Sequence, residues 1–257
     1  MSNFKLKVVQ LPAKHAGRQM IKRQKVAHAA SPIKDARTLK ALRAALADSG
    51  KYARRNLAIF DLGVCSGRRC GDILSLQLYE IWDDLRGVRS MVEYRDQKTS
   101  TWKKFFMNDS VRSNLMHYLE EVGYVVNGKR VVRNDVFLFP SRKRTQKNDA
   151  GSWYDTKYNK YRPRTETPTG CLSVSSYRRI LNDAAINGGI TDIDHLGTHS
   201  MRKTFGYHGF RQNGAEFVQL ALGHSSMNVT KHYLGMDNEY LEKKYMELNI
   251  PGMDDEI

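Results

Sequence analysis

The stretch LGHSSMNVTKHY, residues 222–233, decides how the rest of the chain is interpreted. Gly223 ends an apolar run with helical spacing, and His224 follows it directly. Tyr233 lies nine residues beyond His224, inside a segment expected to form a helix at about 226–234. The stretch therefore predicts a turn that presents a histidine, followed by a short helix that presents a tyrosine.

Three further motifs lie upstream of this stretch. HSMR, residues 199–202, begins a predicted helix at 200–213, and another helix is expected at 215–222. SGRRCGD occupies residues 66–72, and QKT at 97–99 occupies the turn of a predicted hairpin. The strands of that hairpin are expected at 89–94 and 103–107. Arginine, lysine and histidine thus recur at the ends of regular elements.

Apolar residues at helical spacing predict the remaining helices. The first runs from Leu39 to Leu46 and stops before Gly50. Others are expected at 57–64, 72–78, 109–122 and 173–186. The stretch from Phe139 to Cys171 is polar without strong periodicity and is expected to be a loop. Together the patterns predict an α+β fold that is mainly helical, with a small antiparallel β-sheet.

This ordered set of motifs resembles the tyrosine recombinase, or phage integrase, family. The resemblance extends from about Ser31 to Leu248, and its specificity lies in the order and spacing of the motifs, because each motif alone is common. It implies a catalytic domain at 31–250, after a basic arm at 1–30 and before an acidic tail at 251–257. Many members carry a full helical domain ahead of the catalytic one, and here only the short arm is expected.

The resemblance implies that Tyr233 is the nucleophile, which forms a covalent 3′-phosphotyrosine link with DNA. The transition state carries extra negative charge on the phosphate oxygens, and fixed cations stabilise that charge. Arg69 and Arg202 fit this role because guanidinium groups bind phosphate oxygens bidentately and stay charged. His224 would add a further hydrogen bond to the same phosphate.

The proton transfers are assigned by the same resemblance. His199 is the expected general base for the phenol, and Lys98 in the hairpin turn is the expected acid for the leaving 5′ oxygen. Asp72, one helical turn after Arg69, would brace the active-site cations. The phosphotyrosine retains the bond energy, so no cofactor, ATP or metal is expected.

A metal site is the alternative for one pair of histidines. His195 and His199 are spaced i, i+4, as zinc ligands on a helix often are. The glutamate of a metalloprotease helix is replaced by Leu196, and no third ligand is evident. The pattern therefore favours a chain without metal.

The net charge of +15 favours a polyanionic partner. Residues 1–34 hold eight Lys or Arg and no acid, residues 142–164 hold eight against two acids, and residues from 235 onward carry −5. The two basic stretches are expected to contact double-stranded DNA, with contacts assigned to Lys22, Arg23, Arg142, Lys143 and Arg144. The three cysteines are too few for a disulfide framework, and no apolar run reaches membrane-spanning length.

The expected function is site-specific DNA recombination or integration by an integrase of mobile-element type. Self-association into a tetrameric synapse on DNA and a cytoplasmic, DNA-associated location are expected with it. Accessory DNA-bending proteins are left open. Two other functions fit the same residues: a type IB-like enzyme that relaxes DNA, and a non-catalytic DNA-binding regulator with the same fold.

Overall fold

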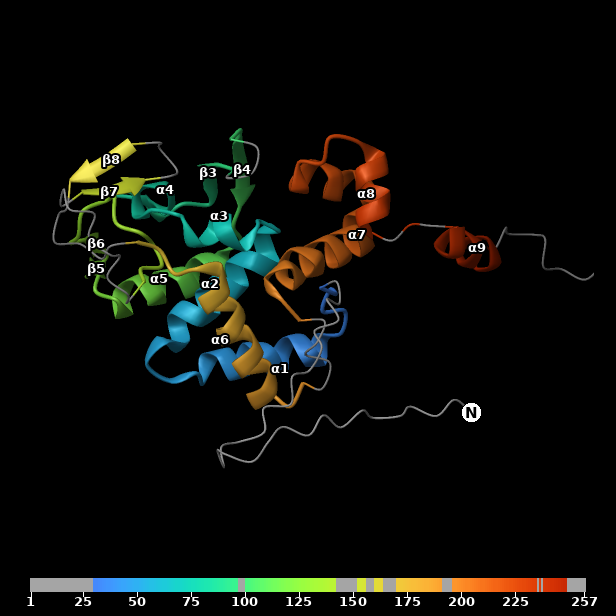
Figure 1. The fold of residues 1–257 in the computed structure, drawn as a ribbon, viewed down its shortest axis with the longest axis horizontal. Coiled ribbons are helices and arrows are strands. Elements are labelled where there is room, and N and C mark those ends of the chain that lie inside the picture. The colour runs from blue at the N-terminus through green and yellow to red at the C-terminus, as the bar shows by residue number, and fades with distance from the viewer. Residues whose placement is uncertain are drawn as a thin grey trace, which may run out of the picture.

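The chain folds as a set of helices with short hairpins between them (Figure 1). The computed structural model describes residues 30–96, 100–141, 152–155, 160–163, 170–190, 196–234, 236 and 238–248. The expected α+β fold, mainly helical with antiparallel strands, is confirmed. Within these ranges no helix combines the length and apolar character needed to cross a membrane.

The first helices form around a buried apolar face. Helix α1 (Ala36–Ala47) begins where the Asp35 side chain accepts a hydrogen bond from the Thr38 backbone N–H at 2.7 Å. Its Leu42 and Leu46 are fully buried. A 3-10 turn, η1 (Gly50–Tyr52), leads into α2 (Ala53–Ser66), which packs against α1. Gly67 ends α2 at φ 65°, a conformation that favours glycine.

The strands pair as separate two-stranded antiparallel sheets. The longest pair in the described part of the chain is β3 (Met91–Arg95) with β4 (Trp102–Phe106), close to the strands expected at 89–94 and 103–107. The other pairs are β1 (Trp82–Asp83) with β2 (Gly87–Val88), β5 (Val125–Val126) with β6 (Lys129–Arg130), and β7 (Ser152–Asp155) with β8 (Lys160–Pro163).

Two sequence expectations are wrong in part. The helix expected at 72–78 is two helices, α3 (Cys70–Leu74) and α4 (Leu78–Ile81). Gln77 between them is extended, because its backbone N–H donates to the Glu80 carboxylate at 2.8 Å and it bridges to Phe137. The stretch expected to be a loop after Phe139 contains the β7–β8 hairpin.

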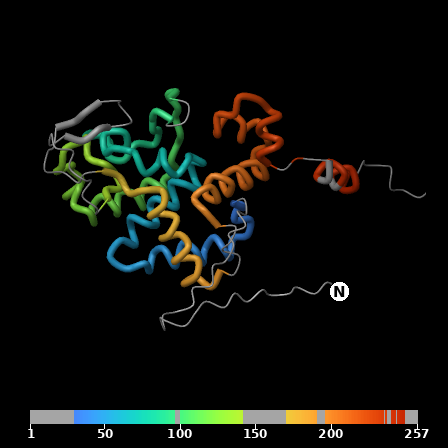
Figure 2. The backbone as a smooth tube through the Cα atoms, viewed as in Figure 1, coloured from blue at the N-terminus to red at the C-terminus, as the bar shows by residue number. Residues whose placement is uncertain are grey.

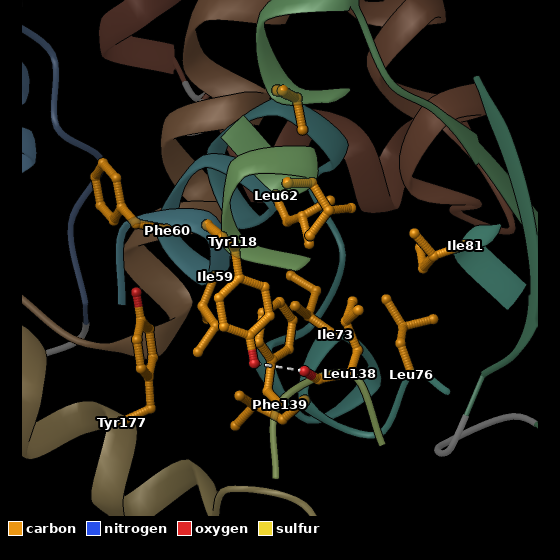
Figure 3. Close-up of a cluster of buried hydrophobic side chains, with 14 of the residues drawn as sticks. Ile59, Phe60, Leu62, Ile73, Leu76, Ile81, Tyr118, Leu138, Phe139 and Tyr177 are labelled. Carbon is orange, nitrogen blue, oxygen red and sulfur yellow. Dashed lines mark hydrogen bonds between the residues drawn. The ribbon is translucent and has the colours of Figure 1, made fainter. Parts of the chain in front are cut away.

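The core lies between α2, α3, α5 (Asp109–Glu121) and α6 (Val174–Asn187), and Figure 3 shows its centre. Tyr118 donates to the backbone oxygen of Leu138 at 2.7 Å, and its ring stacks on Phe139 with centroids 5.4 Å apart. Tyr177 is fully buried and donates to the backbone oxygen of Asn56 at 3.0 Å. Both buried hydroxyls are therefore satisfied by backbone carbonyls.

The C-terminal part consists of α7 (Thr198–Leu222), α8 (Met227–Leu234) and α9 (Asn238–Met246). Helix α7 packs against α2 at a close approach: a Cβ on Gly63 would lie 2.9 Å from the Cβ of Met201. Gly214, at φ 82° and ψ 177°, breaks α7 into the two helices expected at 200–213 and 215–222. Helix α8 packs against α7, and Figure 2 shows this orange and red part of the chain on one side of the body of the protein.

Replacing Leu62 with Ala should lower the free energy of unfolding by about 2–5 kcal/mol, because a buried leucine leaves a cavity. Leu62 is 1% exposed at the centre of α2. The matched control is Leu85→Ala, since Leu85 is 96% exposed and its truncation should change stability by less than about 0.5 kcal/mol. Urea unfolding of both variants measures the difference, and equal losses would contradict the assignment of α2 to the core.

Candidate active site

Arg202 joins three parts of the chain that lie far apart in sequence. It projects from the first half of α7 and is 7% exposed. Its Nη1 donates to the backbone oxygen of Gly67 at 2.6 Å, and its Nη2 donates to that of Leu222 at 3.2 Å. Burial lowers the pKa of Arg202, although a guanidinium stays charged at any physiological pH. The SGRRCGD, HSMR and LGHS motifs therefore meet at one buried cation.

The two arginines of the SGRRCGD motif point to different surroundings. Arg68 is 2% exposed and donates to the Tyr94 hydroxyl at 2.9 Å and to the backbone oxygen of Ala221. The Arg69 side chain is 29% exposed, and its Nη1 donates to Asp96 Oδ2 at 2.5 Å. Arg68 thus ties the hairpin and the end of α7 together, while Arg69 faces the open side of the site.

His224 lies directly after the glycine that ends α7. Gly223 adopts φ 65°, and the ring Nδ1 of His224 lies 3.0 Å from Thr230 Oγ1 in α8. In the tautomer in which Thr230 donates to Nδ1, the opposite ring nitrogen carries the proton and can donate to an anion. Burial, and then the charge of Arg202, lower the pKa of His224.

Tyr233 packs against α7 through a contact that only glycine permits. A Cβ on Gly206 would lie 2.7 Å from Cε1 of Tyr233, and the tyrosine and His224 rings meet edge to face with centroids 5.1 Å apart. The Tyr233 hydroxyl is buried and hydrogen-bonds to no residue that the structure describes, His199 included. Burial raises the pKa of Tyr233 to about 12, against an opposing effect of Arg202.

His199 lies one turn before Arg202 in α7. Burial is the main cause of its lowered pKa, and the positive charges of Arg202, Arg69 and Lys203 lower the pKa further. His199 is therefore neutral at pH 7 and able to accept a proton.

The remaining expected site residues divide into two groups. Asp72 is 3% exposed in α3, and its bracing role stays a prediction. The expected general acid, Lys98, lies outside the described residues. So do the expected DNA contacts, which are Lys22, Arg23, Arg142, Lys143 and Arg144.

The sequence motifs missed four residues that shape the site. Asp96 binds Arg69, Lys103 Nζ binds Asp96 at 3.0 Å, Thr230 holds His224, and Gly206 seats the tyrosine. A signal existed for Lys103, because residues alternate along a strand and Lys103 shares a face with the buried Phe105. Thr230 lies only six residues from His224 in the same stretch, whereas Asp96 and Gly206 depend on contacts between distant segments.

The assembled cluster is a site for an anion next to a nucleophilic side chain. The charges of Arg202 and Arg69 both act on the His224 imidazole, and the Tyr233 phenol ring lies against that imidazole. Such a cluster suits a phosphate group and the charge that develops on it during transfer. Among the described residues, no three His, Cys, Asp or Glu side chains gather as metal ligands, and His195 lies outside them.

Comparisons with known proteins show which family and fold the chain shares. The probable integrase/recombinase YoeC of Bacillus subtilis (strain 168) is 25% identical over 219 residues, covering 85% of this chain and 96% of YoeC. The XerA recombinase structure matches with a TM-score of 0.57 at 21% identity, over 86% of this chain. XerH bound to its difH substrate matches with a TM-score of 0.56 at 17% identity, over 87% of this chain.

The match to these structures concerns the fold. The chain spans 65% of the XerA chain and 55% of the XerH chain. A family model described as "Phage integrase family" matches residues 35–239, which include the four motifs and most of the described helices. The chain therefore belongs to the phage integrase family.

Proposed function

We propose that this protein is a tyrosine-type site-specific recombinase that cleaves and rejoins double-stranded DNA through a 3′-phosphotyrosine at Tyr233. The observation that carries the proposal is a buried phenol packed against His224 and lying in the field of Arg202. Family membership supports it, because the match includes every one of these residues. A nucleophile beside an anion site is what transfer of a phosphoryl group requires.

The scissile phosphate binds between Arg69, Arg202 and His224. Arg202 is already fixed by two backbone oxygens, so little reorganisation remains when the phosphate arrives. Arg69 is partly exposed. Its planar guanidinium has five N–H donors, and one on Nη1 binds Asp96. The two guanidinium groups stabilise the charge of the pentacoordinate transition state.

The reaction forms a bond between Tyr233 Oη and phosphorus and breaks the bond from phosphorus to the 5′ oxygen. The phenol proton passes to His199, and the 5′ oxygen takes a proton from Lys98. In the resting arrangement the Tyr233 hydroxyl is buried against Gly206 and has no hydrogen bond to His199. Binding of DNA must therefore shift α8 until base and phenol come within hydrogen-bond distance.

DNA as the partner is supported by charge and by relatives. The net charge is +15, and the matched XerH structure is described as bound to its difH substrate. We assign backbone contacts to the two basic stretches, with Lys22 and Arg23 in the arm and Arg142, Lys143 and Arg144 in the middle. Phosphate contacts of this kind hold the protein on DNA and leave sequence choice to groove contacts.

Self-association on DNA is proposed through α9. This helix touches its own domain where Tyr240 meets Phe210, with ring centroids 6.2 Å apart. Leu241 and Tyr245 lie on one face and are 53% and 68% exposed, and Leu248 just beyond is 63% exposed. An apolar helix face that its own domain leaves uncovered suits a groove on a neighbouring copy.

Replacing Tyr233 with Phe should abolish the covalent adduct and preserve DNA binding, because the ring still fills its place against Gly206. The measurement is denaturing electrophoresis after incubation with nicked DNA that carries the target site, together with a binding titration. The control is Tyr207→Phe, which removes a tyrosine hydroxyl from the neighbouring helix α7. An adduct that persists in Tyr233→Phe would refute the assignment.

The rate of adduct formation should fall as the pH drops below 6.5. Since the pKa of His199 is lowered from 6.5, the base stays neutral as the pH drops to 6.5 and becomes protonated below that value. Single-turnover rates at subsaturating DNA report groups of the free protein and should show this acid limb. His199→Gln should lose the limb and His224→Gln should keep it. A midpoint above 6.5 would contradict a lowered pKa.

Truncation after Met236 should leave binding to a single site intact and abolish complexes that join two sites. A subtler variant, Leu241→Ser with Tyr245→Ser, should have the same effect because it removes the exposed apolar face. Glu242→Gln is the matched control on the same helix. Native gels with one or two labelled sites measure both properties, and unchanged pairing in the truncated protein would exclude the role of α9.

A further inference from the structure

A buried carboxylate outside the four motifs links two cations of the site. Asp96 follows β3 directly and is 1% exposed. Its Oδ2 accepts from Arg69 Nη1 at 2.5 Å and from Lys103 Nζ at 3.0 Å. Its backbone closes the hairpin, since its N–H donates to Thr101 at 2.9 Å and its oxygen accepts from Ser100 at 2.8 Å. One residue thus fixes the hairpin turn and both cations.

Lys103 belongs to the site although it lies on a strand. Its side chain is 17% exposed on the inward face of β4. A Cβ on Gly223 would lie 3.4 Å from Lys103 Nζ, so the ammonium group lies over the corner that presents His224. The charge of Lys103 is one cause of the lowered pKa of His224. Lys103 therefore adds positive charge beside His224.

The position of Asp96 has an electrostatic reason. Arg68, Arg69, Arg202 and Lys103 bring four positive charges to one small region. Like charges in a partly buried site repel. Backbone oxygens hold Arg68 and Arg202 in place, whereas Arg69 and Lys103 are held by the Asp96 carboxylate. Asp96 offsets part of this charge while binding the two cations that the hairpin side of the site contributes.

We propose that Asp96 is a positioning residue of the reaction, whose carboxylate orients Arg69 and Lys103 toward the scissile phosphate. The inference rests on the proposed function, because it takes the anion to be the phosphate of DNA. It also couples that phosphate to the hairpin, since Asp96 lies two residues before Lys98 in the sequence. Placing the hairpin on DNA and orienting Arg69 are then one event.

The first test compares Asp96→Asn with Asp61→Asn. Asp61 is a matched control because it is also a buried acid, 4% exposed, that binds Arg43 through two hydrogen bonds and lies outside the site. At saturating nicked DNA, Asp96→Asn should lower the single-turnover rate by roughly 10- to 100-fold, as loss of a supporting partner does. DNA affinity should change little, and Asp61→Asn should lose stability without losing rate.

The second test separates positioning from folding. DNA with a methylphosphonate at the scissile position lacks one phosphate charge, so it depends less on correctly oriented cations. The rate deficit of Asp96→Asn should therefore shrink on this DNA. An equal deficit on both DNAs would show that Asp96 acts through folding, and this result would overturn the proposal.

A third measurement does not depend on catalysis. Arginine side-chain NMR of the full chain should show slowed rotation of the Arg69 guanidinium, with Arg69→Lys used for assignment, and Asp96→Asn should release it. If the wild type forms no adduct, the proposed function fails, and these signals still decide whether Asp96 holds Arg69. Signals that stay restrained in Asp96→Asn would overturn the inference.

Lys103→Met provides a second variant if Asp96→Asn fails to fold. It should lower the cleavage rate while leaving the Asp96 to Arg69 contact in place. Lys104→Met is the matched control, since Lys104 lies on the opposite, exposed face of β4. Equal cleavage rates for the two variants would show that Lys103 has no role in the reaction.

Discussion

The structure depends on the burial of two guanidinium groups against carbonyl oxygens at helix ends. The last carbonyls of α2 and α7 have no partner inside their helices. Arg202 binds the oxygens of Gly67 and Leu222, and Arg68 binds that of Ala221. Each arginine gains the hydrogen bonds that a buried charge needs, and each helix end gains a donor. The hydrogen bonds that connect the helix ends therefore also fix the arginines around the proposed anion site.

The motif residues could be recognised from the sequence, but the residues that contact them in the folded chain could not. Glycine, arginine and tyrosine at fixed spacing reveal a turn, a cation and a nucleophile, because each needs a particular residue type locally. Helix α7 was predictable with its break, since Gly214 is the residue that the break requires. The identity of Asp96 as the partner of Arg69 was not, because that contact joins residues 27 positions apart. The extended backbone of Gln77 after α3 depends partly on the bridge to Phe137, which local spacing does not reveal, and partly on a capping box with Glu80 three residues later.

The resting site is assembled for the phosphate and closed for the nucleophile. Its cations hold their places through hydrogen bonds to the protein itself. The phenol, by contrast, is buried with a raised pKa against the face of α7. Under the proposed function, this division would keep the phenol away from DNA until α8 moved, so that recognition and cleavage would be separate steps.

Gly214 determines where the second half of α7 lies. In an unbroken α-helix, the 22 residues from Arg202 to His224 would separate them by about 33 Å, at 1.5 Å per residue. The reversal at Gly214 returns the chain so that Leu222 meets Arg202 and His224 meets Tyr233. The part of the chain after Gly214 thus carries His224 and Tyr233, and a Cβ at Gly214 would meet open space. A substitution that made α7 continuous through position 214 would therefore carry both residues away from Arg202.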